Sequence, residues 1–394
     1  MIGTPDLYAC VVAGFGGLSI SSFHSVMLKK DGSVWTAGRN TYGQLSDGSL
    51  VGKRKFGQRI NGGALSVGTG RHHSFVVMQN GSLLVAGQNS NGELGSAAEQ
   101  ITRFEQVIPD GVQAATAGTW HTLVLKQDGT LWTAGLNDQG QLGLGTPTSY
   151  SPFHKVEFDG VVSNGVKAIA AGEYFSLALK RDGSVWATGS NTYGQLGDGT
   201  TISRNKIRLT TLSSDVVAIS AGREHSIALK QDGSVWGSGR NAKGQLGDGT
   251  NADKSSFEVI GPSGVKAIGT GYYFTVVLQR NGTLWGTGGN NQGQLADGTS
   301  GEMNDRNFFS IMYLRDVHAV TAGGYSCFIL KTNGELWGVG GNQFGQLGDG
   351  SNTGRTGFVL VDSFLAPDLG TRSNALEVPR SCTFAKLRIP GNAV

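Results

Sequence analysis

The sequence predicts an all-β fold, a seven-bladed β-propeller with four antiparallel strands in each blade. One phrase recurs seven times at intervals of 48 to 54 residues, and its apolar residues alternate over short runs without a helical period. Glycine accounts for 64 of the 394 residues, against a usual frequency of ~7%. Regular repetition of four short strands with glycine-rich turns is typical of propeller blades, and a closed ring of blades leaves few exposed sheet edges.

The repeat is fullest at residues 171–200 and 221–250, which read AGEYFSLALKRDGSVWATGSNTYGQLGDGT and AGREHSIALKQDGSVWGSGRNAKGQLGDGT. The asparagine of the phrase G-x-N-x-x-G-[QE]-L marks each of the seven copies: Asn40, Asn89, Asn137, Asn191, Asn241, Asn290 and Asn342. Seven units with a period of about 50 residues occupy nearly the whole chain. The sequence therefore predicts one propeller rather than the two or three domains that length alone would suggest.

Each unit contains four expected strands. In the fourth unit an apolar run at 166–170 is followed by an alternating run at 176–179 and a third strand at 185–188. The GQLGDGT segment then reverses the chain, and a variable stretch with a short apolar run, such as 257–260 in the fifth unit, supplies the fourth strand.

The turn between the second and third strands carries Asp-Gly or Asn-Gly in every unit. Such a pair between alternating runs is the strongest short hairpin signal and is typical of a type I′ turn, whose two central residues need positive φ. The first residues of the seven pairs are Asp31, Asn80, Asp128, Asp182, Asp232, Asn281 and Asn333.

Composition excludes several function classes. A formal net charge of +3 supplies no strong field for nucleic acid or an anionic membrane, so neither is an expected direct ligand. Cys10, Cys327 and Cys382 are odd in number and lack metal-site spacing, which favours a reducing compartment. The apolar stretch 7–20 has no basic residue before it, so we expect no signal peptide, no membrane insertion and an intracellular location.

The segment HSIALKQDGSVW and the following GRNAKGQLGDGT are close to the consensus of the RCC1-like repeat family, the regulator of chromosome condensation type of propeller, and the resemblance covers all seven units. It implies a propeller at 18–365 with flanking segments at 1–17 and 366–394. It also implies that one terminal segment completes the ring by pairing with the opposite end of the chain. Either 7–12 or 382–389 could serve, and the sequence does not choose between them.

Residue types that recur in every blade are interpreted as structural, because an active site is needed only once. Tryptophans at six equivalent positions are expected to pack between blades: Trp35, Trp132, Trp186, Trp236, Trp285 and Trp337. Four recurring histidines are expected to be packed rather than to bind metal: His24, His73, His121 and His225. Five recurring aspartates are expected to cap turns: Asp47, Asp198, Asp248, Asp297 and Asp349. No nucleophile, base or paired-carboxylate set stands apart from the repeat, so we expect no catalytic residue, metal or cofactor, and no enzyme.

The positions that vary between blades are the candidate functional residues. Two residues precede each histidine position in the loop between the first and second strands, and in a propeller these loops share one face near the axis. Binding hot spots are rich in aromatic residues and arginine. We therefore expect a partner-binding face, with packing around the axial tunnel as the alternative interpretation, at Phe23, Arg71, His72, Trp120, Tyr174, Arg223, Glu224, Tyr272, Tyr273 and Tyr325.

A second variable set follows the GQL turn of the first unit. It is basic, and we expect it to form a loop that contacts phosphates or an acidic protein, or that is simply solvated: Lys53, Arg54, Lys55 and Arg59.

These features together predict a non-catalytic protein interaction module, a rigid scaffold that presents loops on one face to a protein partner as a subunit or regulator of a larger complex. The resemblance implies a second candidate, a guanine-nucleotide exchange factor for a small Ran-type GTPase with chromatin association. In the family, exchange uses a β-hairpin wedge inserted in one blade, and the longest interval here, 54 residues, is too short to hold one. The ultraviolet-B receptor branch needs repeated GWRHT motifs, which only 118–122 approaches, and the enzyme-inhibiting branch needs an export signal.

Overall fold

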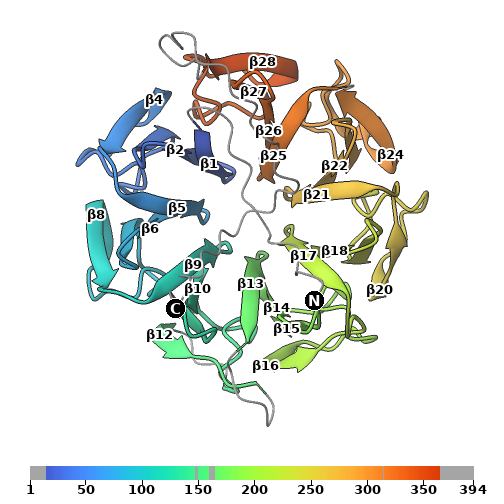
Figure 1. Cartoon of the computed structure of the whole chain (residues 1–394), viewed down its shortest axis with the longest axis horizontal. Coiled ribbons are helices and arrows are strands. Elements are labelled where there is room, and N and C mark those ends of the chain that lie inside the picture. The colour runs from blue at the N-terminus through green and yellow to red at the C-terminus, as the bar shows by residue number, and fades with distance from the viewer. Residues whose placement is uncertain (1–14, 147–149, 159–164, 314, 364–394) are drawn as a thin grey trace, which may run out of the picture.

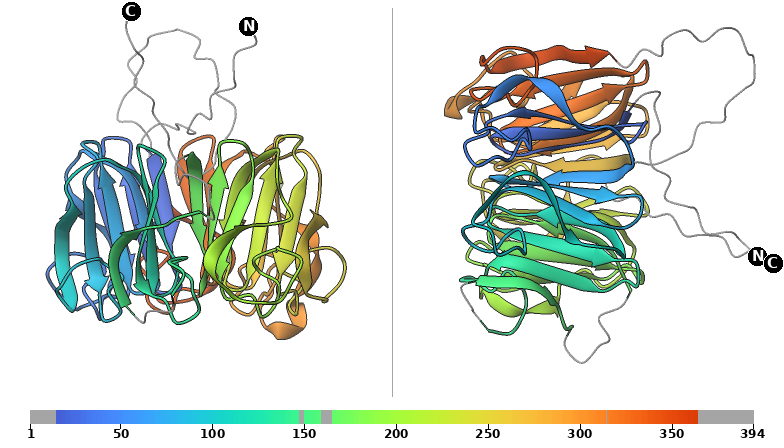
Figure 2. Two further views of the ribbon diagram at one scale, coloured as in Figure 1. Left: turned by 90° about the horizontal axis from the view of Figure 1, so that it is seen from below. Right: turned by 90° about the vertical axis from the view of Figure 1, so that its left-hand side faces the viewer.

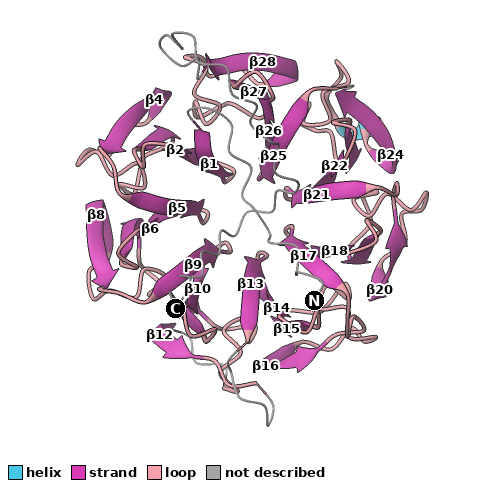
Figure 3. Cartoon of the chain, in the orientation of Figure 1, coloured by secondary structure: helices cyan, strands magenta, loops and turns pink. Residues whose placement is uncertain are grey.

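The computed structural model describes residues 15–146, 150–158, 165–313 and 315–363 (Figure 1). In these residues 28 strands form seven four-stranded antiparallel sheets, arranged as the blades of a closed ring, so the predicted fold is confirmed. One short 3-10 helix, η1 (Glu302–Asn304), precedes the outer strand of the sixth blade (Figure 3). No helix in the described ranges is long and apolar enough to cross a membrane.

Every blade is built from four strands that are consecutive in sequence, and the first of the four lies innermost (Figure 1). The inner strands are β1 (Phe15–Ile20), β5 (Ala64–Thr69), β9 (Val112–Ala117), β13 (Val166–Ala171), β17 (Val216–Ala221), β21 (Val265–Thr270) and β25 (Val317–Gly323). The second strands are β2 (His24–Lys29), β6 (His73–Met78), β10 (His121–Lys126), β14 (Phe175–Lys180), β18 (His225–Lys230), β22 (Phe274–Gln279) and β26 (Ser326–Lys331). The third strands are β3 (Val34–Gly38), β7 (Leu83–Gln88), β11 (Leu131–Leu136), β15 (Val185–Gly189), β19 (Val235–Gly239), β23 (Leu284–Gly288) and β27 (Glu335–Gly340). The outer strands are β4 (Lys53–Ile60), β8 (Gln100–Ile108), β12 (Tyr150–Lys155), β16 (Arg204–Leu209), β20 (Lys254–Ile260), β24 (Arg306–Tyr313) and β28 (Arg355–Ser363).

The hairpin between the second and third strands differs from the predicted type I′ turn. At Asp182-Gly183 only the glycine has positive φ, 85°, and its N–H donates to the Lys180 carbonyl at 3.1 Å. This is the three-residue hairpin in which an ordinary turn is followed by a left-handed glycine. The Asp182 carboxylate accepts from the backbone N–H of Ser184 at 2.9 Å, so the pair was correctly placed but its turn type was wrong.

The recurring tryptophans pack between blades, as predicted. Trp236 of the fifth blade lies against Leu179, Val185 and Leu212 of the fourth, and its indole N–H donates to Ser234 at 3.1 Å. Trp35 of the first blade packs in the same way against the core of the seventh.

The recurring histidines join neighbouring blades by hydrogen bonds. The His225 imidazole lies 3.0 Å from the hydroxyl of Thr275 in the next blade, and that hydroxyl donates to the Gln245 carbonyl at 2.7 Å. The hydroxyl proton is thereby used, so the imidazole Nε2–H is the donor to Thr275. His24, His73 and His121 bond Ser74, Thr122 and Ser176 in the same way.

The recurring aspartates cap the GQLGDGT reversal, as predicted. The Asp47 carboxylate accepts from the Asn40 amide and from the backbone N–H of Ser49, both at 2.9 Å. The Asn40 side-chain oxygen in turn accepts from the Leu45 N–H at 2.8 Å. The glycine-rich segment is therefore held by its own polar side chains.

The ring closes between the seventh and first blades by packing within the described residues. Leu18 and Ile20 of β1 share one buried cluster with Ala319 and Phe328 of the seventh blade. The Gly350 N–H donates to the Arg54 carbonyl at 2.9 Å. Segments 1–14 and 364–394, which include both expected closing strands, lie outside the described residues; the first described strand begins at Phe15, before the expected boundary at 18.

Candidate functional site

The ten variable loop residues lie on the end of the ring formed by the loops between inner and second strands. The bend after each third strand returns to the same end, because the Arg39 N–H donates to the Phe23 carbonyl at 2.8 Å and the Arg240 N–H donates to the Glu224 carbonyl at 2.9 Å. Figure 2 shows the blades edge-on, with these connections at the ends of strands that run roughly along the ring axis. We call this end of the ring the axial face.

One group of predicted residues forms an aromatic cluster over the first three blades. The Phe23 and His72 rings stack with centroids 5.0 Å apart and planes inclined by 5°, and His72 lies 5.7 Å from Trp120. The Arg71 guanidinium lies 5.6 Å from the Phe23 ring and 5.4 Å from the Trp120 ring. Aromatic faces attract a guanidinium, so these four side chains hold one another in place.

A second group forms a tyrosine cluster over the sixth and seventh blades. Tyr272 makes edge-on contacts with Tyr273 at 6.4 Å and with Tyr325 at 5.4 Å. Arg223 from the fifth blade lies 5.3 Å from the Tyr273 ring and hydrogen-bonds its hydroxyl. The loops of three successive blades are thus joined by side chains.

Two acidic residues neutralise arginines of the axial face. Glu173 accepts from Arg223 at 2.5 Å, and Glu224 accepts from Arg240 at 2.6 Å. Desolvation is the largest influence on the Arg223 guanidinium, but the bond to Glu173 outweighs it and raises the Arg223 pKa. Tyr174 is half-buried, and desolvation raises its pKa.

Sequence reasoning missed several residues that complete the axial face. Tyr42 lies 5.0 Å from His72, Phe344 contacts Phe23 at 5.2 Å, and Arg240 lies 4.7 Å from the Tyr193 ring. Arg39 and Glu173 also belong to this set. The missed signal was variation inside the otherwise repeated G-x-N bend, where Arg39, Tyr42 and their equivalents differ from blade to blade.

The positive charge of the axial face helps to lower the pKa of His72. The His72 pKa is lowered to about 3, first by burial and then by the nearby Arg71 and Arg39 guanidiniums. The imidazole is therefore neutral near pH 7 and acts as an aromatic surface rather than as a charge.

The expected basic loop is a strand, which corrects that prediction. Lys53, Arg54, Lys55 and Arg59 all lie on β4, because this segment pairs with β3 to complete the first blade. Lys53 and Arg59 face Asp47 at 3.6 and 4.0 Å, and the Arg59 Nε–H donates to the Leu45 carbonyl at 2.8 Å. Arg54 and Lys55 are exposed on the outer strand of the first blade.

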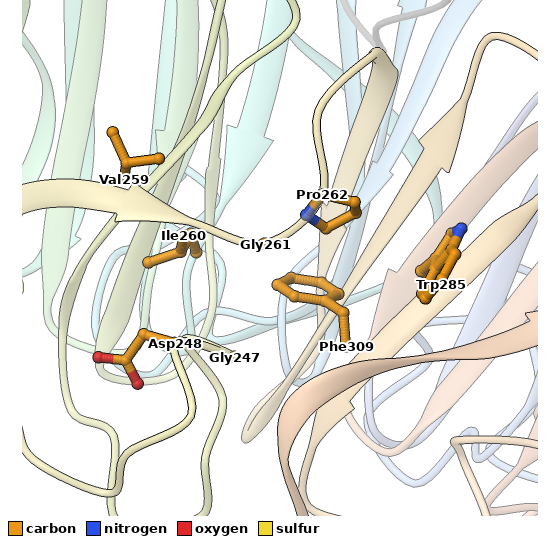
Figure 4. Close-up of a pocket in the computed structure, with 8 residues that line it drawn as sticks. All are labelled: Gly247, Asp248, Val259, Ile260, Gly261, Pro262, Trp285 and Phe309. Atoms are coloured by element: carbon orange, nitrogen blue, oxygen red, sulfur yellow. The ribbon is translucent and has the colours of Figure 1, made fainter.

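A cavity of about 400 Å³ opens on the outer rim between the fifth and sixth blades (Figure 4). Its lining includes Gly247, Pro262, Trp285 and Phe309. The Phe309 ring lies over Gly247, as Phe257 lies over Gly197 one blade earlier, so this cavity belongs to the repeated packing between blades. Within the described ranges, no group of three or more His, Cys, Asp or Glu side chains could hold a metal ion.

Two protein-family models match the sequence of this seven-bladed ring. The family model of the RCC1-like domain matches residues 12–305, and the model of the regulator of chromosome condensation (RCC1) repeat matches residues 317–346. The chain belongs to the RCC1-like family. No curated protein matches the sequence significantly.

Solved structures of the same fold include relatives of this RCC1-like chain at low identity. Human WBSCR16 is 23% identical with a TM-score of 0.71, covering 82% of this chain and 88% of its own. Prp20p of Saccharomyces cerevisiae, described with its binding properties to Gsp1p and histones, is 21% identical with a TM-score of 0.66, covering 78% and 80%. Yeast RCC1 (Prp20) bound to Kap60 is 16% identical with a TM-score of 0.74, covering 91% and 85%. At these low identities the TM-scores show that the fold is shared.

Proposed function

We propose that this RCC1-like propeller is a non-catalytic protein interaction module that presents its axial face to a protein partner within a larger complex. The observation that carries the proposal is the concentration of aromatic and arginine side chains on one face, at loop positions that vary while the rest of the blade repeats. Structural relatives support it, since one solved structure shows yeast RCC1 bound to Kap60 and another is described with binding to Gsp1p and histones.

The aromatic side chains of the axial face are held in place by their neighbours. Phe23, Trp120, Tyr273 and Tyr325 are each half-buried, and each ring contacts at least one neighbour. Their conformations are therefore fixed before a partner arrives, so binding would cost little side-chain entropy. Large aromatic side chains in this state contribute the greatest share of binding energy at protein interfaces.

The proposal is tested by affinity purification from the native source with mass spectrometry. Trp120→Ala and Tyr273→Ala each remove one ring from the axial face, and Phe308→Ala is the matched control because Phe308 is 55% exposed on the outer strand β24. We expect both axial variants to lose partners that the wild type and the control retain. Retention of every partner by both axial variants would refute the proposed face.

The second candidate is guanine-nucleotide exchange on a small Ran-type GTPase. The fold shared with Prp20p, which is described with binding to Gsp1p, favours it. Fold alone is a weak guide to activity, since one fold hosts many functions. Stimulated release of labelled nucleotide from such a GTPase would favour exchange over the interaction module.

A further inference from the structure

The arginines of the axial face are of two kinds. Arg223 and Arg240 each contact a carboxylate, at 2.5 and 2.6 Å. Arg39 and Arg71 have no carboxylate within 4.0 Å in the part of the chain that the structure describes. The positive charge of this face is therefore concentrated on the side of the first two blades.

The two uncompensated guanidiniums share one aromatic ring. Arg39 lies 5.3 Å from the Phe23 ring and Arg71 lies 5.6 Å from it. Phe344 flanks Arg39 at 5.3 Å, and Trp120 flanks Arg71 at 5.4 Å. The rings contribute no hydrogen-bond acceptor in the strict sense, so contact with them leaves the guanidinium N–H groups available to a carboxylate.

The hydrogen-bonding capacity of these two side chains is mostly unused within the described residues. The Arg71 Nε atom is buried and has no hydrogen-bond partner, and the Arg39 Nε–H donates to the Thr41 hydroxyl at 3.0 Å. No acceptor among the described residues bonds the terminal N–H groups of either guanidinium, so an arriving carboxylate has no internal partner to displace. Two acidic residues of this face, Glu173 and Glu224, are already bonded to other arginines.

We propose that Arg39 and Arg71 form a carboxylate-binding site on the axial face, which receives aspartate or glutamate side chains from an acidic segment of a protein partner. This inference rests on the proposed interaction function and names the chemistry of the partner. Guanidinium forks match carboxylates with paired hydrogen bonds, and both arginines are partly buried, which strengthens that attraction. Among the described residues of this face, the uncompensated positive charge covers only the first two blades, since Glu173 and Glu224 neutralise the arginines further round the face, so a short acidic segment fits the charge pattern better than a long phosphate backbone.

The test measures binding of acetylated hexaglutamate amide to the full chain by isothermal titration calorimetry at low salt. Hexaglutamine amide is the neutral counterpart. We expect the hexaglutamate to bind and the hexaglutamine not to bind. Arg39→Gln and Arg71→Gln should each weaken binding about tenfold, because each removes a charged hydrogen-bond donor. Arg71→Lys, which keeps the charge, should recover part of the loss.

Arg280→Gln is the matched control, since Arg280 is exposed in the turn between β22 and β23, at the end of the ring opposite the axial face, and its loss changes the net charge equally. Unchanged affinity in the Arg39→Gln/Arg71→Gln double variant would overturn the proposal, and so would no binding to the wild type at about 1 mM peptide. Competition by inorganic phosphate at concentrations equal to those of the peptide would overturn it in favour of a small-anion site. Unfolding curves that match the wild type verify that each variant is folded.

The same variants separate this proposal from the proposed function in the affinity purification. Partners lost from Trp120→Ala but retained by the double arginine variant would leave the interaction module standing and refute the carboxylate site. Partners lost from both would support both.

Discussion

Glu93 occupies the position at which the other six blades carry glutamine, and this exchange gives the structure a pH-dependent weakness. In the seventh blade the Gln346 oxygen accepts from the Phe344 N–H at 3.0 Å, and its amide nitrogen donates to the Ser22 carbonyl of the next blade at 2.9 Å. Glu93 repeats the first bond, accepting from the Asn91 N–H at 2.7 Å, but its second oxygen is buried without a partner. An ionised carboxylate cannot donate a proton as the Gln346 amide does.

The size of the expected change in the free energy of unfolding follows from the pKa of Glu93. Glu93 is fully buried, and desolvation is the first cause that raises its pKa from 4.5 to about 7, against the opposing bond from Asn91. Each pKa unit corresponds to 1.36 kcal/mol, so the shift amounts to about 3 kcal/mol. Because the folded pKa is raised, this stability is fully present below pH 4.5 and is lost as the pH rises through about 7.

Glu93→Gln should remove this dependence. At pH 8 we expect the variant to exceed the wild type by up to about 3 kcal/mol in the free energy of unfolding, and at pH 4.5 the two should nearly agree. Urea unfolding followed by tryptophan fluorescence measures the difference. Four buried histidines, His24, His73, His121 and His225, have pKa values lowered to between about 3 and 4, mainly by burial, so they weaken both proteins equally on acidification and cancel in the comparison.

Glu105→Gln is the control, because Glu105 is exposed on the outer strand β8. It should leave the free energy of unfolding unchanged at both pH values. A pH-independent difference between Glu93→Gln and the wild type would refute the reasoning, as would a difference that grows toward acid.

Three further substitutions test the packing of the blades, with the free energy of unfolding as the measurement. Gly288→Ala should lower the free energy of unfolding by well over the ~1 kcal/mol expected for its control, Gly298→Ala. Both glycines have left-handed φ, but only at Gly288 would an added Cβ lie 2.3 Å from the Tyr273 carbonyl oxygen. Equal losses in the two variants would contradict this prediction. His225→Ala should cost about 1–3 kcal/mol through its lost bond to Thr275, and additivity with Thr275→Val in a double-mutant cycle would mean that the bond contributes nothing. Trp236→Ala should cost about 3 kcal/mol by opening a cavity between two blades; a change below about 0.5 kcal/mol would show that the ring is not needed there.

The blades could be predicted from the sequence because their determinants are local and repeated seven times. The Asp182-Gly183 pair places a hairpin, and Asn40 with Asp47 places a reversal, whatever lies elsewhere in the chain. The turn type was wrong since an Asp-Gly pair fits both a two-residue turn and the longer turn that ends in a left-handed glycine. Lys53 and its neighbours were expected in a loop because their charge conceals the alternation of an outer strand.

Part of the axial face could be predicted from the sequence, but residues such as Arg39 and Glu173, and the charge pairing of the face, could not. Repeat alignment brings Arg71 and Arg223 to equivalent loop positions, and neither local sequence shows whether the arginine meets a carboxylate of another loop. What separates them is a neighbouring loop 50 residues away, where Glu173 faces Arg223, whereas Phe23 faces Arg71. Such pairing depends on where side chains reach across a seam between blades, which single-sequence reasoning does not provide.

Ring closure by packing also has a consequence for how this chain acquires its structure. Each described sheet is complete as soon as its own four consecutive strands have been synthesised, because none borrows a strand from the distant end of the chain. Contacts within a blade are short in sequence, which favours rapid, stepwise assembly during translation. Among the described residues, the seam where β1 meets the seventh blade must wait for the last blade. A partly synthesised chain is therefore an open arc of finished blades, whose two end faces stay exposed until that last seam forms.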